Sequence, residues 1–349
     1  MHLVDEARAG SIGKEGFGNS EWREDYSVRC SNCLYLPLSQ TNHRQRIAQS
    51  LQSYMSKDHD SLKTLRVSCL TKLSAFKRVA LVGDGKGIPA LLERVPLTNV
   101  VCLIAASIRP QYLDALIRLS QINGRPLLVQ PKSRDTSASQ RFIEEFRRQG
   151  CDSLICHSYS MKLPAAMLEM VNGNAVNIHA ALLPKNRGPN PIQWAIIRGE
   201  NVTGVTAHQM AEEIDAGPII DQIPVAISLD DTWVTLANKI DVATGVLTHR
   251  VIPLVLRGGV TCIPQDDRQA TKNTRLTPES PRINFRSMSD LEVYNLIRAQ
   301  VSPLGGAFLE GLRRERFYFR DYVPLDRIRF LRESYFKNGL RGISAVVDG

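Results

Sequence analysis

Residues 78–87 read RVALVGDGKG, a short apolar run followed directly by closely spaced glycines. A strand that ends in a glycine-rich turn is typical of the start of an α/β domain. Apolar runs then alternate with segments long enough to form a helix. Short continuous apolar strands separated by helices predict a parallel sheet covered on both faces. We expect strands over 78–82, 99–106, 126–129, 153–157 and 175–179, and helices over 88–94, 110–122 and 137–149.

The glycines after the first strand form a weak nucleotide-binding pattern. Gly83, Gly85 and Gly87 are spaced GxGxG, whereas the dinucleotide fingerprint is GxGxxG. That fingerprint also needs an acidic residue near the end of the second strand, and this strand ends in Ala106 and Ser107. We therefore interpret the glycines as a tight strand-to-helix turn, with NAD binding as the weaker alternative.

The length of 349 residues exceeds what one compact core usually needs, so we expect more than one domain. Residues 1–75 show weak periodicity and are interpreted as an N-terminal extension. The α/β pattern occupies residues 76–263. Residues 264–349 predict a small mixed α+β domain with a helix over 290–300 and a strand of a barrel or hairpin over 316–320. The basic tail of this domain is either a solvated face or, less favoured, an RNA surface.

The composition is that of an ordinary globular protein, with 43% hydrophobic and 23% charged residues. The longest apolar run, 100–106, is too short to span a membrane, and charges interrupt the first ten residues. Seven scattered cysteines favour a reducing compartment, so we expect a soluble, cytoplasmic protein. The CxxC at Cys30 and Cys33 has no second pair, so no metal is predicted. The net charge of +9 suits nucleic acid, an anionic membrane or a phosphorylated substrate equally.

Three polar side chains are the candidate chemistry. Asn177 and His179 lie two apart at the end of a buried strand, so they point to the same side of it. Asp215 precedes Ala216-Gly217-Pro218, a turn. An amide donor can stabilise an oxyanion, and a histidine with a carboxylate can move a proton. Because none of the three is a serine or cysteine nucleophile, they favour direct transfer of a group between substrates, without a covalent enzyme intermediate. The residue types alone leave structural roles equally open.

The motifs around these residues resemble those of the formyltetrahydrofolate-dependent N-formyltransferases. They are Asn177-Ile-His179, Leu182-Leu-Pro-Lys-Asn-Arg-Gly188, Thr203-Gly-Val-Thr206 and Asp215-Ala-Gly217, within a resemblance that covers about residues 77–310. The resemblance implies a Rossmann-like formyltransferase domain and an enzyme that uses N10-formyltetrahydrofolate. It implies that Asn177, His179 and Asp215 are the catalytic residues. Ala181 stands where the family commonly has a serine.

The resemblance also implies a pterin pocket formed by two loops. One loop follows the strand over 153–157 and contributes Ser158, Tyr159 and Met161. The other precedes Asp215 and contributes Met210 and Ile214. Tyr159 and Met161 are equally consistent with core positions.

The acceptor is expected to be a small amine. Methionyl-tRNA formyltransferases carry a long basic insertion after the second strand, whereas here Ser107 leads through Ile108 and Arg109 straight into a helix. Only about 85 residues follow Pro264, which is short for a tRNA-binding barrel. We favour an amino group on a nucleotide-linked sugar, with hydroxyornithine second and tRNA unfavoured. A non-catalytic binding protein on the same fold is the alternative from another class, and a homodimer stays open.

Overall fold

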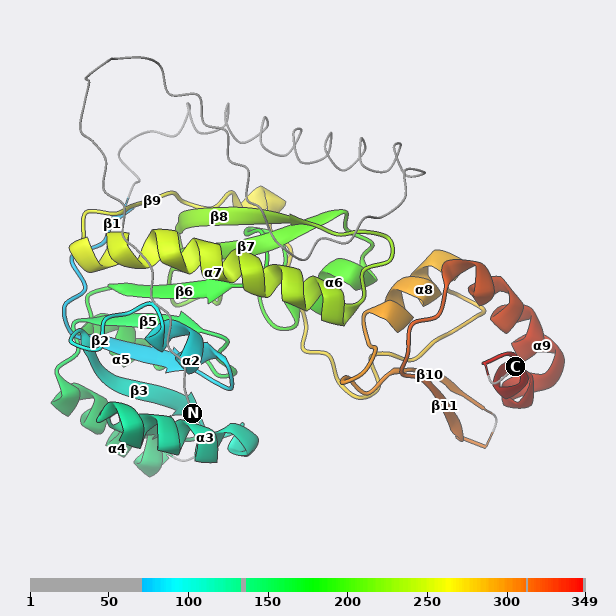
Figure 1. Cartoon of the computed structure of the whole chain (residues 1–349), viewed down its shortest axis with the longest axis horizontal. Coiled ribbons are helices and arrows are strands. Elements are labelled where there is room, and N and C mark those ends of the chain that lie inside the picture. Colours follow the sequence, from blue (N-terminus) through cyan, green and yellow to red (C-terminus); the bar gives the residue numbers. More distant parts are fainter. Residues whose placement is uncertain (1–70, 133–135, 312, 348–349) are drawn as a thin grey trace, which may run out of the picture. The chain divides into compact units, whose positions relative to one another are not determined.

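The computed structural model describes residues 71–132, 136–311 and 313–347 (Figure 1). The expected N-terminal extension lies outside the described residues except for residues 71–75. Cys30 and Cys33 also lie outside them.

A seven-stranded sheet forms the centre of the domain, in the order β4-β3-β2-β5-β6-β7-β8. Its first five strands in this order are parallel, and β7 and β8 run antiparallel to their neighbours. The strands are β2 (Val79–Gly83), β3 (Val100–Ala106), β4 (Leu127–Gln130), β5 (Ser153–His157), β6 (Ala175–His179), β7 (Val202–Gln209) and β8 (Ile219–Ala226).

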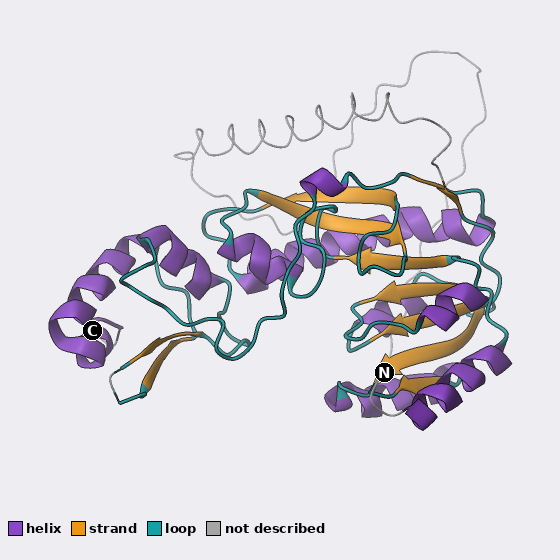
Figure 2. Cartoon of the chain, turned by 180° about the vertical axis from the view of Figure 1, so that it is seen from behind, coloured by secondary structure: helices purple, strands orange, loops and turns teal. Residues whose placement is uncertain are grey.

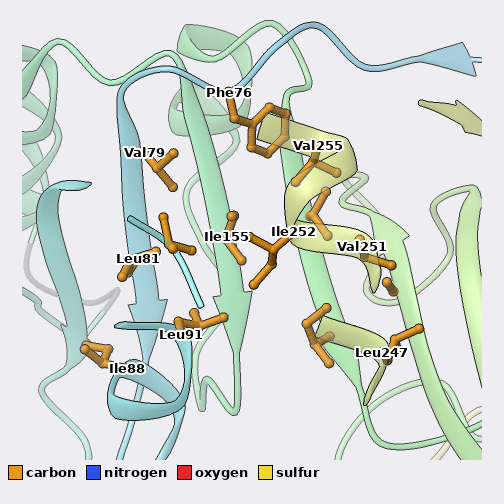
Figure 3. Packing of buried hydrophobic residues seen from close by; sticks show 14 of the residues in the cluster. Phe76, Val79, Leu81, Ile88, Leu91, Ile155, Leu247, Val251, Ile252 and Val255 are labelled. Atoms are coloured by element: carbon orange, nitrogen blue, oxygen red, sulfur yellow. The ribbon is translucent and has the colours of Figure 1, made fainter. Parts of the chain in front are cut away.

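Helices cover both faces of this sheet. Successive residues of a strand point to opposite faces, and strands such as β2 and β5 are buried at every position, so both faces must be covered. On one face, side chains of β2, β3 and β5 form a core cluster with α2 (Gly87–Leu92), α3 (Pro110–Asn123) and α7 (Trp233–Arg257). On the other face they pack against α4 (Thr136–Gln149) and α5 (Ala165–Met170). Figure 3 shows the first cluster, where Ile155 of the sheet lies beside Ile252 of α7.

The expected strands and helices of the sheet region are found at nearly the expected positions. The sheet is mixed at one side, however, and not wholly parallel. β6 leads through the short helix α6 (Pro191–Ile197) into β7, and a short connection joins β7 to β8. Antiparallel strands need no long crossover, so a short connection is sufficient here.

The glycine turn after β2 makes a close approach to a neighbouring strand end. A Cβ added to Gly87 would lie 2.1 Å from the carbonyl oxygen of His157, and one added to Gly83 would lie 2.5 Å from it. Only glycine fits such a contact, which agrees with the interpretation of a tight turn.

The C-terminal region has a small hydrophobic cluster of its own, formed by helices around a hairpin. It contains α8 (Asp290–Arg298), the antiparallel pair β10 (Ala307–Glu310) and β11 (Arg316–Phe319), and α9 (Leu325–Val347) with a kink at Gly339. Within the described residues β10 and β11 form a two-stranded sheet, and Phe308 of β10 makes one isolated parallel bridge with Arg282, so the expected strand belongs to a hairpin and not to a barrel.

A long connection leads from the sheet domain to α8. It starts after β9 (Thr261–Cys262), which pairs with β1 (Thr71–Lys72), and it includes a single 3₁₀ turn, η3 (Asp267–Gln269). Figure 2 shows this connection as mostly loop between the sheet and the C-terminal helices. Its residues 271–276 form hydrogen bonds with the loop that follows β6 and with α6.

Candidate active site

A cavity of about 460 Å³ lies beyond the carboxyl ends of β5 and β6. Open α/β sheets bind their ligands at this edge, where the loops leave the strands. All eight residues singled out in the sequence line it: Asn177, His179, Asp215, Ser158, Tyr159, Met161, Met210 and Ile214. The structure therefore brings together residues from three separate segments of the chain.

Asp215 is the centre of the polar wall of this cavity. Its side chain is only 9% exposed, and its backbone is left-handed, with φ of 56°. Its Oδ2 accepts a hydrogen bond from the backbone N–H of Gly188 at 2.8 Å, and its Oδ1 accepts one from Asn177 Nδ2 at 3.2 Å. The Nδ1 atom of His179 lies 3.4 Å from Oδ2.

These neighbours decide the charge of the Asp215 carboxyl. Burial alone would raise its pKa, because a buried carboxylate loses its hydration. The nearby His179 charge, the hydrogen bond and charge of His208, and the N–H of Gly188 oppose burial and together hold the pKa of Asp215 well below its usual range. The site therefore contains a buried, ionised carboxylate at neutral pH.

Asn177 points its amide nitrogen inward. Nδ2 donates to Asp215 and lies 3.1 Å from Nε2 of His208. Nδ1 of His208 lies 2.9 Å from the carbonyl oxygen of Gln209, so in the neutral ring Nδ1 donates and Nε2 accepts from Asn177, whereas in the protonated ring Nε2 donates to Asp215 Oδ1, 3.4 Å away. With a neutral His208 both Nδ2 hydrogens have protein partners, and a substrate carbonyl must replace one of them.

His179 lies between two acceptors. Its Nε2 donates to the carbonyl oxygen of Asn186 at 2.9 Å, while its Nδ1 faces Asp215. A protonated ring would satisfy both acceptors at once. Asn186 is itself 1% exposed, and its side-chain amide lies 3.0 Å from both carboxylate oxygens of Glu200. The hydrogen bonds between Asn186 and Glu200 therefore hold the loop that orients His179.

The sequence reasoning did not identify His208 as a site residue. His208 is 1% exposed, lines the cavity and places its Nε2 3.4 Å from Asp215 Oδ1. Its place beside Asn177 comes from the antiparallel register of β6 and β7, in which Asn177 pairs with His208. Its only signal in the sequence is its position two residues after the Thr-Gly-Val-Thr motif.

Thr206 supplies the hydrogen bonds of the turn at Ala181. Its hydroxyl donates to the Ala181 carbonyl oxygen at 2.6 Å and accepts from the N–H of Leu183 at 3.2 Å. The loop is therefore anchored without a serine at position 181.

The residues expected to form the pterin pocket form the less polar wall. Tyr159 turns its hydroxyl away to donate to Gln130 Oε1 at 2.6 Å, and burial raises the pKa of this phenol. Its ring packs against the core cluster on the α4 and α5 face, as Met210 does. Ile214 is 53% exposed, beside Asp215. Tyr159 is thus both a lining residue and a core residue, which the sequence left as alternatives.

Three cations also line the cavity: Arg109, Lys162 and Arg275. Arg109 donates through Nε to the Ser160 hydroxyl at 2.9 Å. Among the residues that the structure describes, none of the three cations forms an ion pair with an acid. The cavity can therefore accept an anionic ligand.

The described part of the chain lacks two kinds of feature. It contains no group of three or more His, Cys, Asp or Glu side chains arranged to hold a metal ion. None of its helices combines the length and the apolar character needed to cross a membrane.

Comparison with known proteins gives a consistent family. The formyl transferase family model matches residues 93–252. A methionyl-tRNA formyltransferase of Halalkalibacterium halodurans is 39% identical over 173 residues, which are 50% of this chain and 53% of that protein. The chain spans about half the length of the curated relatives it matches.

Two solved structures have the same fold. A 4-N formyltransferase from Francisella tularensis has a TM-score of 0.58 and 19% identity, over 71% of this chain and 98% of its own. A sugar N-formyltransferase from Shewanella sp. has a TM-score of 0.57 and 19% identity, also over 71% and 98%. Residues 93–252 of this chain are thus similar to the formyl transferase family, and its fold is that of the two solved formyltransferases.

Proposed function

We propose that this protein is an enzyme that transfers a formyl group from N10-formyltetrahydrofolate to a primary amine, with Asn177, His179 and Asp215 as its catalytic residues. The observation that carries the proposal is the convergence of the other two side chains on the buried Asp215 carboxylate. This convergence lies in a cavity at the carboxyl edge of the sheet. A purely structural cluster has no reason to open into a cavity of this size.

Asp215 is suited to receive the proton of the attacking amine. It is ionised at neutral pH, because His179, His208 and the Gly188 N–H stabilise its charge. The amine must be unprotonated to attack the formyl carbon, and it loses a proton as the new C–N bond forms. A carboxylate within reach of that nitrogen acts as the general base.

Asn177 and His179 stabilise the negative charge that develops on the formyl oxygen. Asn177 Nδ2 exchanges one of its two protein partners for this oxygen. His179, held beside Asp215 and Asn186, acts on the same oxygen. Donors fixed in a buried site are effective because they need little reorganisation during the reaction.

The cavity suits the formyl donor in size and lining. Its volume lies within the range of about 300–1,000 Å³ that is usual for small-molecule sites. Ser158, Tyr159 and Met161 on one loop and Met210 and Ile214 on the other form the proposed pterin wall. When bound there, the donor would supply an activated formyl carbon, and its N10 leaving group would take up the proton that Asp215 received from the amine.

For the acceptor we favour a small amine, an amino group on a nucleotide-linked sugar. Arg109, Lys162 and Arg275, which form no ion pair within the described part of the chain, favour an acceptor with phosphate groups. β3 ends at Ala106 and α3 begins at Pro110, so no basic insertion separates them. This chain matches 98% of the length of each of the two formyltransferase structures, from Francisella and Shewanella, which also supports a sugar acceptor. Hydroxyornithine stays the second small amine.

Methionyl-tRNA is a second candidate acceptor, favoured by a separate observation. The Halalkalibacterium relative is named for that substrate and is 39% identical over half of this chain. The expectation that tRNA is unfavoured therefore has no support from the relatives.

A panel assay separates these acceptors. Purified protein and N10-formyltetrahydrofolate are incubated with dTDP- and UDP-linked 4-amino sugars, hydroxyornithine or methionyl-tRNA, and formylated product is measured by mass. We expect transfer to an amino-sugar nucleotide with a shallow salt dependence. Efficient formylation of methionyl-tRNA, with log K falling by about 0.7–0.9 per unit of log salt for each phosphate contacted, would replace the sugar with tRNA. Binding of folate without transfer to any acceptor would favour a non-catalytic protein.

A further inference from the structure

Gln265 holds the turn that carries Asp215. Its side-chain Nε2 donates to the backbone carbonyl oxygen of Asp215 at 2.8 Å and to that of Gly217 at 2.7 Å. Both hydrogens of the amide are thus used on the two sides of one turn. Gln265 is half-buried and does not line the cavity, so it acts on the site from behind.

The same side chain also holds the loop that carries Gly188. Oε1 of Gln265 accepts from Nε of Arg187 at 3.0 Å and from Nη2 of Arg187 at 2.8 Å. Arg187 is 3% exposed and is followed by Gly188, whose N–H bonds to the Asp215 carboxylate. One amide group therefore joins the backbone of Asp215 to the loop that binds its side chain.

Asp215 has a particular need for such support. Its φ of 56° is a conformation that a residue with a Cβ rarely adopts, and it persists only when the surroundings impose it. The carboxylate must also reach Gly188, Asn177 and His179 from that backbone. A small rotation of the turn would move both oxygens away from these partners.

We propose that Gln265 is a positioning residue, which fixes the left-handed turn of Asp215 relative to the loop at Arg187 and Gly188 so that the carboxylate is aligned for proton transfer. This role rests on the proposed formyl transfer by Asp215. Gln265 lies in the connection that leads to the C-terminal region. The geometry of the site thus depends on a segment outside the family match at residues 93–252.

Two substitutions test this role, with a matched control. Gln265→Glu keeps the shape and the acceptor for Arg187 but turns an oxygen toward the carbonyls of Asp215 and Gly217. Gln265→Met removes the donors without adding charge. Arg187 keeps its ion pair with Asp267 at 2.7 Å in both variants, which favours folding. The control is Gln269→Glu, the same change on the same segment at an exposed side chain that bonds only to Asp266.

Steady-state kinetics on the panel acceptor that the wild type formylates fastest gives the first readout. In both Gln265 variants we expect kcat to fall by about 10- to 100-fold, the scale of misplacing a catalytic group. KM for both substrates should change by less than about 3-fold, because Gln265 does not touch the cavity. A merely structural role would lower the number of intact sites, counted by tetrahydrofolate titration, and leave kcat per intact site unchanged.

Hydrogen exchange gives a second readout that needs no activity. The amide of Gly188 donates to Asp215, so a peptide covering residues 186–190 should exchange faster in both Gln265 variants than in Gln269→Glu. Wild-type kcat and wild-type exchange in the folded Gln265 variants would overturn the positioning role. An inactive wild type, or a fully active Asp215→Asn variant, would instead overturn the proposed function.

Discussion

Replacement of Asp215 by asparagine tests the proposed chemistry most directly, because it removes one charge and almost no volume. In the wild type the two carboxylate oxygens accept from donors on opposite sides, Gly188 N–H at 2.8 Å and Asn177 Nδ2 at 3.2 Å. An amide has only one oxygen, so its NH₂ group must face one of these donors. The variant therefore loses the proton acceptor and also one hydrogen bond in the site.

The size of each effect follows from these contacts. Loss of a positioned general base lowers turnover by about 10²- to 10⁴-fold. One donor left without its acceptor in a buried site costs about 1–3 kcal/mol of folding free energy. Removal of a buried charge offsets part of that cost, because burial opposes ionisation of Asp215. We therefore expect a folded protein with a turnover at least ~10²-fold lower.

The assay measures formylated product by mass, at saturating donor and acceptor, with tetrahydrofolate titration to count intact sites. The matched control is Asp241→Asn, the same change at a partly exposed residue whose ion pair with Lys86 lies on the surface. Surface pairs contribute little, so this variant should keep its activity. Wild-type turnover in a folded Asp215→Asn variant would refute the role of Asp215 as the base.

Three further outcomes are expected. The folded-state pKa of Asp215 lies below its unfolded value near 4, so its contribution to stability is complete above about pH 4 and is lost as the pH falls below that value. Urea unfolding from pH 7 to pH 3 should therefore show a smaller loss of stability in Asp215→Asn than in the wild type, and parallel curves would contradict this. His208→Phe removes the acceptor of Asn177 Nδ2 and should lower turnover by about 10-fold, whereas His208→Gln, which keeps polar atoms there, should lower it less; equal rates would exclude a role for His208. Tetrahydrofolate alone should raise the melting temperature in a concentration-dependent way, and a protein that responds to NAD but not to folate would favour the oxidoreductase interpretation.

The sequence by itself predicted the five parallel strands of the sheet and the position of Asn177 and His179 at one strand end. Runs such as 79–82 and 154–156 are apolar throughout and alternate with helix-length segments, which is typical of strands buried on both faces. The two-residue spacing of Asn177 and His179 placed both at one strand end, and the structure has them there, beside the cavity. Local patterns of this kind depend only on neighbours along the chain, which is why they can be read without a structure.

Only the tertiary structure decided how distant segments meet. His208 belongs to the site because β7 runs antiparallel to β6 in one particular register, and a shift of one residue would turn its side chain to the other face. Gln265 is 50 residues from Asp215 along the chain, and no sequence pattern predicts the hydrogen bond between them. The inward direction of the Asn177 amide is likewise set by the charge of Asp215. Register, loop crossing and charge in a buried site are properties of the folded chain, and therefore the structure alone decides them.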